Sequence, residues 1–125
     1  PKWVVKKMVD LLEQENPGCF DDPDKIFLDP YMKSGLYITE IVKRLYRSEK
    51  MRQAFPDDNA RLEHIFAKQV YGLAPTEIIY RIAISYILGF AKGHGITAHH
   101  IRHADTLEFA KAGTMERELD KIFRD

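Results

Sequence analysis

Short apolar runs that alternate with amphipathic helical segments are the feature that most constrains the fold of this chain. The run at 26–29 lies between Asp-rich flanks and meets Pro30, which ends a strand. Further strands are expected at 69–73 and at about 98–104, the last with poor alternation. Strand–helix units in this order form an open parallel sheet. We therefore expect an α/β fold with a partial parallel sheet of about three strands, helices on both faces and the first strand central.

Helical periodicity fills the segments between these strands. A first amphipathic helix ends at the Asn-Pro-Gly sequence 16–18, and a second follows Gly35, with apolar residues at helical spacing over 38–45. The segment 54–59 has turn chemistry and is expected to be a loop. A short helix is expected around 62–66, before the second strand.

The third major helix is strongly apolar. Thr76 is a good N-cap, and Glu77 beside it suits a helix N-terminus. Because apolar residues occupy much of 78–90, we expect this helix to be well buried and to close at the glycines of 93–95. A last amphipathic helix is expected over 115–123.

The composition excludes several classes of protein. With 125 residues, 45% of them hydrophobic, the chain has the size and apolar content of one globular domain, so wholesale disorder is excluded. Its one cysteine excludes an intramolecular disulfide and suits a reducing cytosol, so we expect a cytoplasmic protein. The apolar runs are too short and too often interrupted to span a membrane. The formal net charge is zero, which is atypical of a free-standing nucleic-acid binder.

Charge is unevenly distributed along the chain. Between Asp10 and Asp29 there are seven acidic residues against Lys25 alone. Between 40 and 53 the balance reverses, with five basic residues against two acidic ones. The basic segment is interpreted either as a solvated helix face or as a phosphate-contacting surface that needs a partner.

The segment that follows the first strand, Asp-Pro-Tyr-Met-Lys-Ser-Gly at 29–35, is the most informative in the chain. In open parallel sheets, ligands bind outside the carboxyl ends of the strands, where a loop presents unpaired backbone N–H groups and the positive end of a helix. The Asp29 carboxylate can accept hydrogen bonds from a ligand amine or hydroxyl. Equally, Pro30 and Gly35 are common turn residues, and Asp29 can be a helix-capping acid. The residues alone leave both interpretations open.

This segment resembles the cofactor loop of adenine-specific DNA methyltransferases of restriction-modification systems, usually written D-P-x-x-G-S-G. The flanking runs 27–30 and 37–40 also match that pattern. Upstream, residues 1–12 resemble the family's T-P-x-x-V-V segment and the helix that follows it. Downstream, 70–73 resembles its second strand and 104–107 its D-S-L segment. The four blocks occur in the family's order and cover roughly residues 1 to 107.

The resemblance implies a Rossmann-like methyltransferase fold and S-adenosylmethionine as cofactor. The loop would contact the amino-acid part of the cofactor, and Asp105 would accept a hydrogen bond from the exocyclic amine of its adenine. The cofactor-binding residues that the resemblance implies are Asp29, Pro30, Tyr31, Lys33, Ser34, Gly35, Glu77, Asp105 and Thr106.

Two positions depart from the family's pattern. Lys33 replaces the first glycine of the loop, so a bulky charged side chain stands where backbone would approach the ligand closely. Ala74 occupies the position expected for the acid that grips the ribose hydroxyls, and Glu77 lies one helical turn later.

The family's catalytic segment, Asn/Asp-Pro-Pro-Tyr/Phe, does not occur in this sequence. We therefore expect residues 1–125 to be the N-terminal part of a methyltransferase catalytic domain, truncated before that segment. The full-length enzyme would methylate the exocyclic amine of adenine in DNA, with DNA as substrate and a nuclease or specificity subunit as candidate partner. The isolated chain would hold no catalytic residue and would be inactive.

Two other functions stay in view. The first is a non-catalytic relic or interaction domain with the same fold, favoured by Lys33 and Ala74. The second is a small DNA-binding module working alone, favoured only by the basic helix at 43–52. Fold does not decide between these classes.

Other reactive or aromatic residues favour no separate site. His94, His99, His100 and His103 are expected to be ordinary surface or half-buried histidines, and we expect no metal. Cys19 has no basic neighbour that would lower its pKa, so it is a poor nucleophile candidate. Three aromatic residues are interpreted either as core or rim side chains or as stacking partners of an adenine ring: Trp3, Tyr31 and Tyr37.

Overall fold

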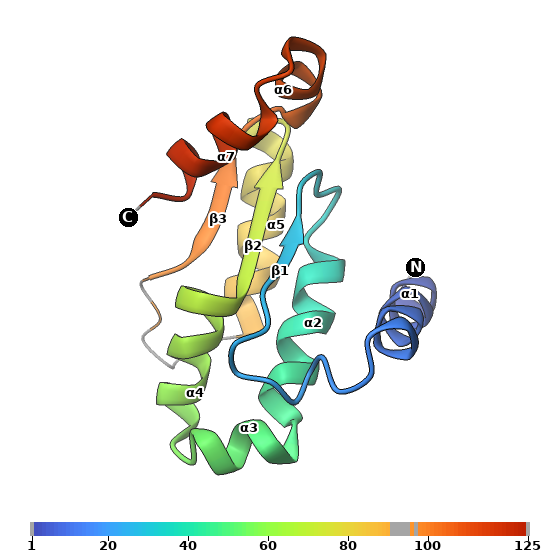
Figure 1. The fold of residues 1–125 in the computed structure, drawn as a ribbon, viewed down its shortest axis with the longest axis vertical. Helices are drawn as coiled ribbons and strands as arrows, with labels where there is room; N and C mark the ends of the chain where they lie inside the picture. The colour runs from blue at the N-terminus through green and yellow to red at the C-terminus, as the bar shows by residue number, and fades with distance from the viewer. Residues whose placement is uncertain (1, 91–95, 97, 125) are drawn as a thin grey trace.

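A computed structural model describes residues 2–90, 96 and 98–124, and Figure 1 shows its fold. The strands are β1 (Phe27–Asp29), β2 (Val70–Ala74) and β3 (His100–His103). They form a three-stranded parallel sheet in the order β1-β2-β3. The expected α/β fold is confirmed, and the sheet with its flanking helices is consistent with a Rossmann-like fold.

The prediction that the first strand is central is wrong, because β2 lies between β1 and β3. Both crossovers step in the same direction across the sheet, so the order in space equals the order in sequence. β1 would be central only if another strand paired with its outer edge, and none of the described residues does so. The strands lie where the apolar runs predicted them, with boundaries that differ by one or two residues.

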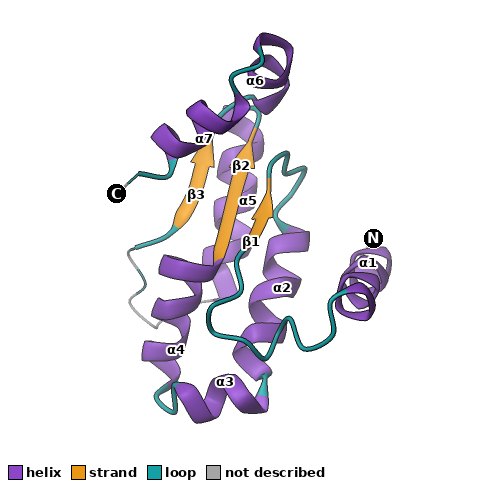
Figure 2. Ribbon diagram, viewed as in Figure 1, coloured by secondary structure: helices purple, strands orange, loops and turns teal. Residues whose placement is uncertain are grey.

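Helices fill the connections between the strands (Figure 2). They are α1 (Lys2–Glu15), α2 (Leu36–Arg47), α3 (Glu49–Ala54), α4 (Asp58–His64), the π-helical turn η1 (Ile65–Gln69), α5 (Glu77–Phe90), α6 (Thr106–Ala112) and α7 (Met115–Ile122). Within the described part of the chain, no helix is long and apolar enough to cross a bilayer.

Local side-chain caps explain several helix boundaries. The Thr76 hydroxyl accepts a hydrogen bond from the Ile79 backbone at 3.2 Å, so the predicted N-cap of α5 is confirmed. The segment 54–59 is only partly the expected loop, since α3 runs to Ala54 and α4 begins at Asp58. Asp57 shortens this loop because its carboxylate accepts from the Ala60 backbone at 2.8 Å and starts α4.

The helices are divided between the faces of the sheet. In Figure 1, α2 and α5 lie behind the sheet, and the main core is built between them and the strands. On the opposite face, Phe123 follows α7 and packs edge-on against Tyr71 of β2, with ring centroids 5.2 Å apart. α1 packs against α2 beyond β1, and this arrangement creates the site described below.

The prediction that α5 is well buried is wrong for its outer face. Ala83 and Ile87 are buried against the sheet, but Ile78, Ile82 and Tyr86 are 71%, 44% and 47% exposed. A helix that covers one face of a three-stranded sheet buries only one stripe of its surface, whatever its outer composition. The expected closing glycines at 93–95 lie outside the described residues.

Candidate functional site

A cavity of about 540 Å³ opens between α1 and the loop that joins β1 to α2. This volume is typical of small-molecule sites, which span about 300–1,000 Å³. Val5 and Met8 of α1 form one wall. Six of the nine predicted cofactor residues line the same cavity: Asp29, Pro30, Tyr31, Lys33, Ser34 and Gly35.

Hydrogen bonds tie the loop to the ends of the neighbouring strands. The Met32 backbone donates to the carbonyl of Leu73 at 2.8 Å, and the Thr106 hydroxyl donates to the carbonyl of Pro30 at 2.8 Å. The Met32 side chain is fully buried over Gly72, where an added Cβ would lie 2.6 Å from its sulfur. The loop is therefore held by the end of β2 and by Thr106, the first residue of α6, and these contacts preorganise the cavity wall.

Gly35 fits α2 closely against α5. It has φ +80, which favours glycine, and a Cβ there would lie 2.9 Å from the Ala83 Cα. The backbone of Gly35 is thus both a left-handed N-cap and a point of helix–helix contact. The first turn of α2 consequently begins beside the cavity, which Leu36 and Tyr37 also line.

Asp29 combines a structural bond with a free acceptor. Its Oδ1 accepts from the Tyr31 backbone at 3.2 Å, and no hydrogen bond from the described residues reaches Oδ2. Burial raises the pKa of Asp29, and the Tyr31 N–H opposes this by favouring the ionised form. Asp29 therefore stabilises the turn after β1 and does not cap α2, whose N-cap is Gly35. Its role toward a ligand stays a prediction.

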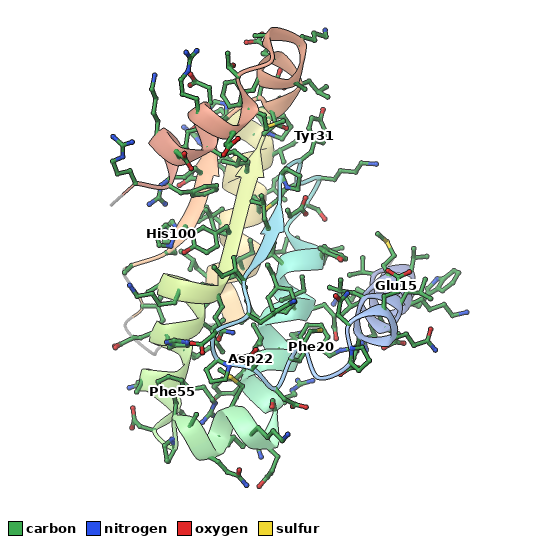
Figure 3. The ribbon with its side chains drawn as sticks, in the orientation of Figure 1. Glu15, Phe20, Asp22, Tyr31, Phe55 and His100 are labelled. Carbon is green, nitrogen blue, oxygen red and sulfur yellow. The ribbon has the colours of Figure 1, made fainter. Side chains whose placement is uncertain are left out.

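Two aromatic side chains stand at this cavity and one does not. Tyr31 is partly exposed in the loop, where Figure 3 labels it, and Tyr37 also lines the cavity. Burial and then the charge of Asp29 raise the pKa of Tyr37. Trp3, the third aromatic candidate, is not among the lining residues.

The remaining three predicted residues lie outside this cavity lining. Asp105 accepts from the Leu107 backbone at 3.0 Å and thereby caps α6. Glu77 is ion-paired with Arg81 at 3.1 Å, and its Oε2 lies 3.3 Å from Nδ1 of His103. Thr106 reaches the loop only through its bond to Pro30. The structure thus gathers six candidates in one place and leaves three at the ends of β2 and β3.

Sequence reasoning did not identify Met32 as the side chain that fixes the loop. Its signal was an apolar residue inside an otherwise polar turn, a pattern that marks a side chain folded into the core.

The described histidines and the cysteine pack against neighbouring side chains of the fold or are buried in it. His100 stacks on Tyr71 with ring centroids 4.6 Å apart, and burial followed by the charge of Arg102 lowers the pKa of His99. Among the described residues, no three potential ligands gather around a metal position, and His94 lies outside those residues. Cys19 is buried, and burial followed by the charge of Glu13 raises the pKa of its thiol.

The basic segment is partly neutralised within the fold. Arg44 of α2 pairs with Asp10 at 2.8 Å, with Glu13 at 3.7 Å and with Glu40 at 2.9 Å. The acidic end of α1 and Glu40 of α2 therefore already share the charge of Arg44, one of the five basic residues of this segment.

A curated protein of Mycoplasma pneumoniae, named an uncharacterized adenine-specific methylase, is 30% identical to this chain over 77 residues. The match covers 62% of this chain and 18% of that relative, so the chain corresponds to a small part of it. No family model matches the chain, and no solved structure matches it significantly.

Proposed function

We propose that this chain is the cofactor-binding, N-terminal part of an adenine-specific DNA methyltransferase of the restriction-modification type. The observation that carries the proposal is the convergence of six loop residues on one cavity, among them Asp29, whose Oδ2 accepts no hydrogen bond from the described residues. The name of the Mycoplasma pneumoniae relative supports the same class of enzyme.

The cavity residues fit S-adenosylmethionine in kind. Oδ2 of Asp29 would accept a hydrogen bond from the ligand ammonium, and the first turn of α2 and the Lys33 ammonium would favour the ligand carboxylate. When bound, the cofactor supplies a methyl group on a sulfonium centre for attack by an amine. Glu77, Asp105 and Thr106 remain proposed cofactor residues at the ends of the neighbouring strands.

The proposal assigns cofactor binding to residues 1–125 and catalysis to a segment beyond them. The full-length enzyme would act on adenine in DNA in the cytoplasm, with a nuclease or specificity subunit as a candidate partner. The purified chain alone should transfer no methyl group to DNA, because it lacks the segment that positions the target amine. Radiolabel transfer above background that Asp29→Ala abolishes would overturn this assignment.

A second candidate is a non-catalytic relic with the same fold. It is favoured by the Lys33 side chain in the cavity lining and by Ala74, a fully buried residue without an acid, at the end of β2. In such a protein the cavity would persist as architecture without appreciable cofactor affinity.

Calorimetry with S-adenosylmethionine distinguishes the two candidates. Asp29→Ala should weaken binding about ten- to a hundredfold, since losing a charged acceptor costs roughly 1.5–3 kcal/mol. Asp24→Ala is the matched control, because Asp24 is an exposed acid of the preceding segment and lies outside the cavity lining. Absence of heat at millimolar cofactor, from both this chain and a longer form that includes the catalytic segment, would favour the relic.

A further inference from the structure

A second groove lies next to the candidate cofactor cavity, and three of its seven lining residues are lysines. It has a volume of about 160 Å³ and lies between the start of α1 and the first half of α2. Lys2 and Lys6 line it from α1, and Lys43 lines it from α2. Val5 and Leu36 line both this lysine groove and the cofactor cavity, so the two are neighbours.

The acidic residue in the lysine groove is already engaged. Glu40 is bonded to the Arg44 guanidinium at 2.9 Å, on the side of α2 where Asp10 also pairs with Arg44. Neither Lys2 nor Lys6 has an ion-pair partner among the described residues. Acids of the second half of α1 thus neutralise Arg44, whereas the first half of α1 carries an uncompensated positive charge.

This arrangement opposes helix stability. Lys2 and Lys6 stand at i and i+4 of α1, where like charges repel. The first turn of α1 as described contains no acid that would offset this repulsion. A bound polyanion would offset it, so the cluster is better suited to a complex than to the free protein.

An exposed aromatic ring stands on the same helix. Trp3 is 64% exposed, and the Lys7 ammonium lies 5.6 Å from the centroid of its ring. Lysines interleaved with a solvent-facing aromatic ring fit nucleic acid, because phosphates pair with the ammonium groups while bases or sugars pack on the ring.

We propose that Lys2, Lys6 and Lys43 bind the phosphate backbone of DNA, with Trp3 packing on the same strand. The choice of DNA among polyanions rests on the proposed function. The common wall at Val5 and Leu36 brings the bound strand beside the cavity whose methyl donor would modify it.

Titration with a short labelled DNA duplex tests this surface by anisotropy and by tryptophan emission. Trp3 is the only tryptophan, so its emission reports directly on this helix and should change as DNA binds. Three phosphate contacts predict a slope of about −2.7 in log K against log salt concentration. The triple variant Lys2→Gln, Lys6→Gln, Lys43→Gln should lose most of this slope and most of its affinity at low salt.

The control variant is Lys25→Gln with Lys50→Gln, which removes exposed lysines that lie outside this groove. It should bind DNA as the parent does. Circular dichroism and thermal melting should show that all variants are folded. The proposal is wrong if the triple variant keeps the parent's DNA affinity and salt slope. It is also wrong if Trp3 emission does not change when DNA is added.

Two further measurements separate DNA binding at this groove from binding of other polyanions and from the proposed cofactor function. Binding of polyglutamate or of anionic phospholipid vesicles as tight as that of DNA would overturn the assignment to nucleic acid. Calorimetry with S-adenosylmethionine on the triple variant should match the parent, because the three lysines do not line the cofactor cavity. A parent chain that binds S-adenosylmethionine but not DNA would overturn the DNA surface alone, and one that binds DNA but not S-adenosylmethionine would overturn the proposed function alone.

Discussion

An aspartate follows or ends two strands of the same sheet, and the two carboxylates have different surroundings. Asp29 ends β1, lines the cavity, and precedes a loop that runs to the start of α2 at Leu36. Asp105 follows β3, caps α6 directly and lies outside the cavity lining. Each carboxylate accepts through Oδ1 from the backbone N–H two residues later, so the two acids differ in the cavity and the helix end beside them and not in their hydrogen bonds.

The largest expected effect comes from replacing Gly35, the left-handed N-cap of α2 at the end of the loop that follows β1. Gly35→Val places a Cβ 2.9 Å from the Ala83 backbone at a left-handed φ of +80, so both strain and steric clash oppose folding. We expect a loss of at least about 2 kcal/mol in the free energy of unfolding. Urea denaturation measures this loss.

Gly113→Ala, at the end of α6, is the matched control on the β3 side. Gly113 has φ +70, but a Cβ there meets nothing within 4 Å, so only the conformational cost remains. We expect about 1 kcal/mol, at the low end of the cost of a left-handed non-glycine residue. Equal losses for the two variants would show that contact with α5 does not hold the loop.

The second prediction separates the two aspartates. Asp105→Ala removes the cap of α6 and should lower the free energy of unfolding by about 1 kcal/mol. Asp29→Ala should instead weaken cofactor binding, as described above. Chemical denaturation measures the free energy of unfolding of both variants, and calorimetry measures their affinity for S-adenosylmethionine. A larger loss of cofactor affinity for Asp105→Ala than for Asp29→Ala would reverse the comparison.

Much of the loop after β1 was predictable because its signals are contiguous. Asp29, Pro30 and Gly35 lie in one short segment of the sequence, 29–35, and the apolar run before them predicts the strand that positions them. Thr76 was predictable as an N-cap for the same reason, since a cap acts on residues three positions away.

The features that sequence did not reveal depend on distant parts of the chain. The central place of β2 follows from which edges pair, and no local pattern encodes this. The exposed face of α5 is as apolar as a protein core, but its burial depends on whether another part of the protein packs over it. The engagement of Glu77 by His103 likewise joins the start of α5 to the end of β3.

A third prediction concerns the lysine in the cavity lining. If Lys33 only obstructs the loop, Lys33→Gly should strengthen binding of S-adenosylmethionine, because glycine allows close backbone approach. If Lys33 pairs with the cofactor carboxylate, the same variant should weaken binding by several-fold. Calorimetry reads the sign, and an unchanged affinity would contradict both roles.

The smallest effect, and the sharpest contrast between the two aspartates, is the pH dependence of stability. Burial raises the pKa of Asp29 above its value in the unfolded chain, so the folded protein holds more protons between the two pKa values. Stability therefore falls as the pH rises through that window, and at neutral pH the ionised carboxylate destabilises the fold. Asp29→Asn keeps an oxygen acceptor for the Tyr31 N–H and removes the buried charge.

Asp29→Asn should therefore melt at a higher temperature than the parent at neutral pH, and the gain should shrink as the pH falls toward the ordinary range of an aspartate. Asp105→Asn keeps an oxygen for the Leu107 N–H but loses a charge that a helix N-terminus favours, so it should gain no stability at neutral pH. Thermal melts of the parent and both variants across the acidic range measure these differences. A lower melting temperature for Asp29→Asn at neutral pH would mean that its charge stabilises the fold, and the unbonded oxygen would then have a structural partner in place of a ligand.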